Sequence, residues 1–112
     1  MQVNIIVNLD FEAVHRWEGC NIKEVEFLKY RHRHIFKIQC KKQVSHTDRD
    51  IEIICLKRDI QSYLSNKYKS RDLGNSSCED LAIEILTNFK LDYCSVLEDG
   101  ENGAEVYKEE GE

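Results

Sequence analysis

The first stretch of the chain, residues 2–15, alternates between apolar and polar side chains with almost no interruption. Its apolar positions are Val3, Ile5, Val7, Leu9, Phe11 and Ala13. A period of two over this length predicts a long strand with one buried face. His15 continues the apolar phase, so we expect its imidazole to point inward at the end of this strand.

A second alternating stretch, residues 30–41, carries two more histidines on its apolar phase. That phase consists of Tyr30, His32, His34, Phe36, Ile38 and Cys40. Because residues i and i+2 of a strand share a face, His32 and His34 should point inward while Arg33 points away. Consecutive strands with a short connection are most simply antiparallel neighbours, which would bring His15 close to both.

The three inward histidines form a candidate metal site. A buried imidazole must be hydrogen-bonded or metal-bound, because an unpaired polar group away from water is costly. Three neutral imidazoles leave a fourth tetrahedral position open, which is typical of catalytic rather than structural zinc sites. His15, His32 and His34 are therefore predicted zinc ligands; the alternative is a pair of half-exposed histidines near a strand end. The fourth histidine, His46, lies in the polar loop 43–50 and is expected to be exposed.

The middle of the chain has helical periodicity. From Glu52 to about Tyr68, apolar residues recur every three or four positions, which predicts an amphipathic helix. A second helix follows, with either Ser76 or Ser77 as its N-cap, and Ser76 and Glu79 have the spacing of a capping box.

The end of the chain returns to strand character. Strands are predicted at 91–98 and 104–108, joined by a turn at 99–103 whose Gly, Asn and Asp residues tolerate positive φ. The order β-β-α-α-β-β predicts a single α+β domain over residues 1–112, with an acidic tail at 109–112 that frays.

Composition narrows the classes of partner. The net charge of −5 argues against a general nucleic-acid binder, and no apolar run is long enough to span a bilayer, so neither nucleic acid nor membrane is expected as a partner. The five cysteines are odd in number and form no Cys-x-x-Cys pair, which indicates free thiols in a reducing cytoplasm.

Several short motifs, in matching order, resemble the 6-pyruvoyl-tetrahydropterin synthase family. The closer similarity is to its bacterial branch, the 6-carboxy-tetrahydropterin synthases of queuosine and 7-deazaguanine biosynthesis. Residues 11–16 resemble the family's Phe-x-Ala-Ala-His-Arg, and residues 32–36 stand where it has His-Gly-His followed by an aromatic residue. The remaining similar segments are residues 45–47, 51–57, 76–82 and 96–98.

This resemblance implies a tunnelling fold, with a four-stranded antiparallel sheet, two helices on one face and subunits that join edge to edge into a trimer or hexamer. It implies that zinc is held by His15, His32 and His34. It also implies that Glu98 anchors a pterin-like or guanine-like ring, and that Ser77 and Glu79 contribute to substrate binding. The implied activity is that of a zinc-dependent carbon–oxygen or carbon–carbon lyase acting on 7,8-dihydroneopterin triphosphate or a related pterin.

The chain departs from the family pattern in its proton-transfer groups. The family's general-base cysteine would fall at positions 26–28, which are Glu, Phe and Leu here. Glu26 is the candidate replacement, because a carboxylate beside zinc can move protons; Cys20 could serve if its loop folds back, and Glu26 as an exposed loop acid is the alternative. The family's Asp-His pair would fall near 67–69, where no histidine exists.

Three hypotheses follow from the sequence. The chain is an active but divergent zinc enzyme, or it is an inactive zinc protein that binds a pterin, deazaguanine or nucleotide. In the third hypothesis only the architecture is shared and the histidines bind no metal. Loss of proton-relay groups normally lowers turnover by orders of magnitude, so the second hypothesis competes directly with the first.

Overall fold

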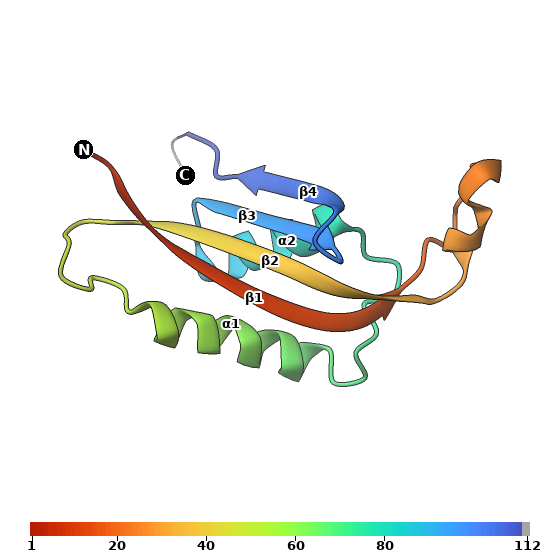
Figure 1. Cartoon of the computed structure of the whole chain (residues 1–112), viewed down its shortest axis with the longest axis horizontal. Coiled ribbons are helices and arrows are strands. Elements are labelled where there is room, and N and C mark those ends of the chain that lie inside the picture. Colours follow the sequence, from red (N-terminus) through yellow and green to blue (C-terminus); the bar gives the residue numbers. More distant parts are fainter. Residues whose placement is uncertain (111–112) are drawn as a thin grey trace.

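A computed structural model describes residues 1–110, so the last two residues of the expected acidic tail lie outside the described part of the chain. The elements are β1 (Val3–His15), a 3₁₀ helix η1 (Lys23–Lys29), β2 (His32–Val44), α1 (Ile53–Lys67), α2 (Cys78–Phe89), β3 (Tyr93–Glu98) and β4 (Asn102–Tyr107). The strands form one antiparallel sheet in the order β1-β2-β3-β4 (Figure 1). The predicted α+β class and the order β-β-α-α-β-β are confirmed.

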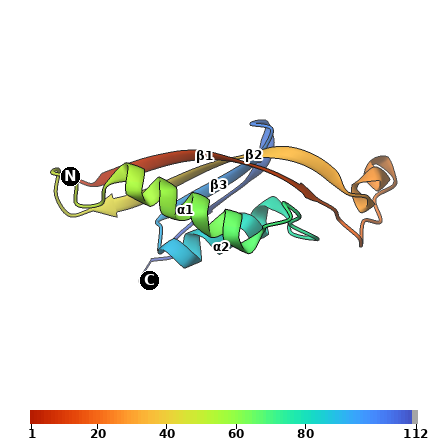
Figure 2. The same ribbon diagram turned by 90° about the horizontal axis from the view of Figure 1, so that it is seen from below.

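Both long helices lie against the same face of the sheet (Figure 2). α1 packs on β1, and α2 packs on β3 and β4. The alternation of β1 and β2 explains this arrangement, because every second side chain of each strand enters the core between sheet and helices. The large apolar side chains that are fully buried in this core include Phe36, Ile38, Ile60, Leu64, Leu81, Ile85, Leu91 and Val96.

The opposite face of the sheet carries polar and charged side chains in cross-strand pairs. Lys37 donates to Asp10 at 2.8 Å, and Gln39 donates to Asn8 at 3.0 Å. Arg33 lies on this face and pairs with Glu12, which confirms that its side chain points away from the histidines. The side chain of Arg33 therefore does not occupy the inward face of β2.

Several predicted boundaries were wrong. β2 begins at His32, so Tyr30 lies outside the strand with 73% of its surface exposed. η1 was predicted only as a connecting segment; its short 3₁₀ turns bury none of its residues, so it produces no apolar periodicity. At the start of α2, Ser77 is the N-cap, so one of the two predicted N-caps is confirmed and only the predicted capping-box pair was wrong.

The capping box of α2 is formed by Ser77 and Asp80, one residue later than the Ser76–Glu79 spacing. Ser77 Oγ accepts from the Asp80 backbone N–H at 3.1 Å, and Asp80 Oδ2 accepts from the Ser77 N–H at 3.2 Å. The backbone carbonyl of Ser76, the residue before this N-cap, accepts from the imidazole of His15.

Two further predictions can be compared with the described residues. All five cysteines are free, as expected. Across residues 1–110, no helix combines the length and the apolar composition that crossing a membrane requires.

Candidate metal centre

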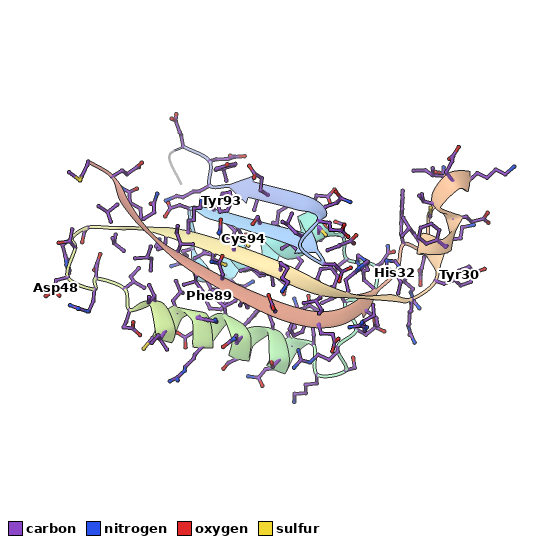
Figure 3. All side chains as sticks on the ribbon, viewed as in Figure 1. Tyr30, His32, Asp48, Phe89, Tyr93 and Cys94 are labelled. Atoms are coloured by element: carbon purple, nitrogen blue, oxygen red, sulfur yellow. The ribbon has the colours of Figure 1, made fainter. Side chains whose placement is uncertain are left out.

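The three predicted ligands meet at one end of the sheet. His15, the last residue of β1, pairs directly with His32, the first residue of β2, and His34 pairs with Ala13. Figure 3 shows His32 at this end of the sheet. Glu98, the last residue of β3, joins them, and one ligand atom from each of the four side chains lies within 4.8 Å of the others. Strand phase together with antiparallel pairing therefore predicted correctly that the three histidines meet.

A flanking segment fixes the end of β1. The residues just before α2 run alongside it, where the Val14 N–H donates to the Arg71 carbonyl at 2.9 Å and the Leu73 N–H donates to the Val14 carbonyl at 2.8 Å. This contact holds Ser76 beside His15, so the chain between the two helices is part of the site.

Each histidine donates a hydrogen bond through Nδ1 to a group outside the cluster. The acceptors for His15, His32 and His34 are, respectively, the Ser76 carbonyl at 2.9 Å, the Tyr30 carbonyl at 2.9 Å and Asp99 Oδ2 at 2.7 Å. Carbonyl and carboxylate oxygens only accept, so each Nδ1 must carry its proton. The neutral form of every ring consequently has a bare lone pair on Nε2.

The bare Nε2 atoms have no protein donor to satisfy them. Among the described residues, Nε2 of His15 and of His34 are buried and have no hydrogen-bond partner. Both face Glu98 Oε2, which lies 3.0 Å from His15 Nε2 and 3.7 Å from His34 Nε2. Lone pairs facing a carboxylate oxygen repel one another, so this cluster requires a cation, either protons or a metal ion, at its centre.

The donor set fits a divalent transition metal. Imidazole nitrogens with a carboxylate oxygen suit zinc and its neighbours, whereas calcium and magnesium prefer all-oxygen sites. Hydrogen bonds from Nδ1 to outer partners are the usual way in which proteins orient metal-binding histidines. The cluster of His15, His32, His34 and Glu98 can therefore hold a metal ion.

The surroundings of the cluster become more open from one side to the other. The side chain of His15 is 9% exposed, that of His34 is 20% exposed, and that of Glu98 is 32% exposed. The buried ring of Phe36 closes the inner side, with its centroid 5.1 Å from that of His15 and 5.7 Å from that of His34. An ion at this site would have an apolar base and an open side toward Glu98.

The open side leads into a cavity of about 580 Å³. The residues that line it come from the end of β1, η1 and the start of β2, from the segment before α2 and its first turn, and from the facing ends of β3 and β4. They include His15, Arg16, Trp17, His32, Asn75, Ser77, Cys78, Glu79, Glu98 and Gly103. This volume is in the range that holds a small-molecule ligand.

Ser77 and Glu79, which the resemblance implies are substrate-binding residues, both line this cavity together with Glu98. Glu98 was expected only as an anchor for a ring, yet here one of its oxygens also faces the histidines. Its position is thus suited to a metal ion as well as to a ligand in the cavity.

Glu26, predicted as the replacement base, is not among the residues that line the cavity. Its side chain is 62% exposed and lies 3.5 Å from Lys29. Cys20 is also absent from the lining, because it is buried in its own loop and donates to the Val25 carbonyl at 3.5 Å. The role of Glu26 as a base stays a prediction from the sequence.

The structure brings in two residues that sequence reasoning missed. Cys78, the first residue of α2, is buried at the cavity wall; burial, and next the negative charges of Glu98 and Glu79, raise the pKa of its thiol to about 12. Asp99 accepts the Nδ1 proton of His34. Its Asp-Gly turn was visible in the sequence, but its contact with His34 depends on strand register.

Comparison with known proteins assigns no family. No protein-family model matches the chain, and no curated protein matches it significantly. The function must therefore be argued from the cluster and the cavity.

Proposed function

We propose that this chain is a zinc protein that binds a pterin-like or guanine-like small molecule in the cavity beside His15, His32 and His34. We further propose that it acts on 7,8-dihydroneopterin triphosphate or a related pterin, as a divergent zinc-dependent lyase of the 6-carboxy-tetrahydropterin synthase type. The observation that carries the proposal is the convergence of bare histidine Nε2 atoms on one carboxylate oxygen, at the rim of a cavity of about 580 Å³.

Zinc is the proposed metal because it suits three imidazoles with one open or exchangeable position. Bound zinc would polarise an oxygen atom of the ligand as a Lewis acid. The chain itself would orient the ring, since the two oxygens of the Glu98 carboxylate can accept two parallel N–H groups. Ser77 and Glu79 border the same cavity and would contact the ligand there.

We also propose that the chain forms a homo-oligomer of the tunnelling-fold type, a trimer or hexamer. In the sheet of the described residues, β1 and β4 are the outer strands. β1 is long, and only its last residues pair with the segment before α2. Exposed strand edges of this length are usually covered by another chain or blocked by charge, so edge-to-edge association is the arrangement we expect.

A second candidate is an inactive zinc protein that holds such a ligand without turning it over. The placement of Glu26 and Cys20 outside the cavity lining favours it. The thiol of Cys78 does line the cavity, but a pKa of about 12 keeps it protonated and a poor base near neutral pH.

The first experiment measures the zinc content of the purified chain by elemental analysis. We expect about one zinc per chain, because the three imidazoles form a single site with one open position. His15→Ala, His32→Ala and His34→Ala should each lose the metal. His46→Ala is the matched control, because His46 is an exposed histidine outside the cluster and its loss should leave zinc unchanged. A wild-type chain that takes up no metal even after zinc is added would contradict the proposal.

The two candidates are then separated by turnover. The zinc-loaded protein is incubated with 7,8-dihydroneopterin triphosphate, and release of acetaldehyde is measured. Release that Glu98→Gln abolishes supports the lyase, whereas tight binding without release supports the ligand-binding protein. Neither binding nor release would restrict the proposal to a metal site with some other ligand.

A further inference from the structure

The three histidines differ in what holds their outer nitrogen. His15 and His32 donate to neutral backbone carbonyls, but His34 donates to a side-chain carboxylate, Asp99 Oδ2, at 2.7 Å. A carboxylate is the stronger acceptor, and it raises the electron density on the opposite ring nitrogen more than a carbonyl does. The electron density on His34 Nε2 therefore depends on Asp99, which follows the end of β3, although His34 itself lies on β2.

Two hydrogen bonds with the backbone of Ile35 hold Asp99 in place. Its Oδ1 accepts the backbone N–H of Ile35 at 2.9 Å, and its own N–H donates to the Ile35 carbonyl at 2.8 Å. The residue has a left-handed φ of 56° and is followed by Gly100 at 78°, which gives the tight turn between β3 and β4. The carboxylate therefore has one oxygen for Ile35 and the other for His34.

The charge of Asp99 agrees with this arrangement. Both of its oxygens accept hydrogen bonds, Oδ1 from the Ile35 N–H and Oδ2 from His34 Nδ1, and hydrogen bonds of this kind favour the ionised carboxylate. An ionised carboxylate can only accept, which requires the proton of a neutral His34 to be on Nδ1.

We propose that Asp99 is a positioning residue for the metal centre: it fixes His34 in the form whose Nε2 is free to bind a metal, and it increases the basicity of that nitrogen. This inference rests on the proposed zinc site, but the form of His34 can be measured without metal. Asp99 contacts His34 at Nδ1, the ring nitrogen opposite the Nε2 that would bind an ion, so it acts on the metal site through His34.

Asp99→Asn gives a sharp test because the amide reverses the hydrogen bond. The Ile35 N–H can only donate, so it retains the amide oxygen and leaves the amide –NH₂ facing His34 Nδ1. Nδ1 must then accept, and the ring proton moves to Nε2, where it blocks the metal. Asparagine also tolerates a left-handed φ, so the turn is preserved.

We expect Asp99→Asn to weaken zinc binding by about 10- to 100-fold in chelator competition, the usual loss for an outer partner of a metal ligand. The matched control is Asp92→Asn. Asp92 Oδ2 also accepts a backbone N–H, from Gln43 at 2.6 Å, but it has no histidine partner among the described contacts. The control should keep wild-type affinity. Equal zinc affinity in Asp99→Asn and wild type would overturn the inference while leaving the zinc site intact.

A second measurement determines which ring nitrogen of His34 carries the proton. It uses nitrogen NMR of the metal-free protein at a pH where the imidazoles are neutral. We expect the Nδ1–H form of His34 in wild type and the Nε2–H form in Asp99→Asn. A wild-type His34 found mainly as Nε2–H would overturn the inference even if the variant does not fold. If wild type binds no zinc but His34 follows this pattern, the proposed function fails and the role of Asp99 in setting the ring proton remains.

Discussion

Glu84 and Glu98 are two partly buried carboxylates of one small protein, and their surroundings differ in one respect. Glu84 joins the two long helices and accepts hydrogen bonds from three donors: Tyr63 Oη at 2.7 Å, Lys67 Nζ at 2.7 Å and Tyr68 Oη at 2.6 Å. Glu98 faces bare nitrogens of histidines instead. The cluster around Glu84 pairs this acceptor with donors from the chain itself. In the cluster around Glu98, the carboxylate oxygen faces other acceptors, the Nε2 atoms of the histidines.

The difference shows which cluster stabilises the fold and which one needs a ligand. A fully satisfied polar network between helices holds their packing and requires nothing further. A partly buried cluster of facing acceptors is destabilising until a cation enters, and such exceptions to polar pairing concentrate at functional sites. Matched substitutions at the two glutamates should therefore have opposite effects on stability.

The largest effect is expected for Glu84→Gln. The amide replaces one acceptor oxygen by a donor, so at least one of Tyr63, Lys67 and Tyr68 loses its partner. The side chain of Glu84 is only 15% exposed, and a donor left unpaired there should lower the free energy of unfolding by about 2 kcal/mol. Urea unfolding at pH 7 measures this. Glu26→Gln is the control, because its exposed ion pair should contribute less than about 0.5 kcal/mol.

A smaller effect of opposite sign is expected for Glu98→Gln without metal. The new amide –NH₂ can donate to the bare Nε2 of a neutral His15, which now lies 3.0 Å from an oxygen of Glu98. We expect the chelator-treated variant to be more stable than wild type by about 1 kcal/mol, the usual net value of one hydrogen bond. Unfolding in the presence of a chelator checks this. A loss of stability like that of Glu84→Gln would mean that the Glu98 carboxylate is a structural acceptor.

The two clusters also differ in how far the sequence could predict them. The strand period of two placed His15, His32 and His34 on one face, and antiparallel pairing then brought them together. Nothing local indicated that Glu84 would meet Tyr63 and Tyr68, because that contact depends on how two helices cross. Asp99 and Cys78 were missed for the same reason: their partners lie across a strand register or at a helix start that shifted by one residue. Patterns along the chain predict on which face of a strand or helix a side chain lies, whereas contacts between elements depend on tertiary packing.

The smallest expected effect is a change in stability at alkaline pH, and it concerns Tyr68 in the cluster around Glu84. Burial, and next the hydrogen bond to Glu84, raise the pKa of Tyr68 to about 12, above its ordinary value of 10. The folded state therefore binds the phenolic proton more tightly than the unfolded state does. The stability from this proton is fully present below pH 10 and is lost as the pH rises toward 12.

Removing the hydroxyl should flatten this dependence. Between pH 10 and 12 the free energy of unfolding should fall less steeply for Tyr68→Phe than for wild type, as measured by urea unfolding at several pH values. The Cys78 thiol titrates in the same range in both proteins, so its contribution cancels in the difference. Tyr30→Phe, at an exposed tyrosine outside the cluster, should keep the wild-type slope. Equal slopes for Tyr68→Phe and wild type would mean that the proton of Tyr68 is not held by the fold. The cluster around Glu84 would then depend on Lys67 and Tyr63 alone.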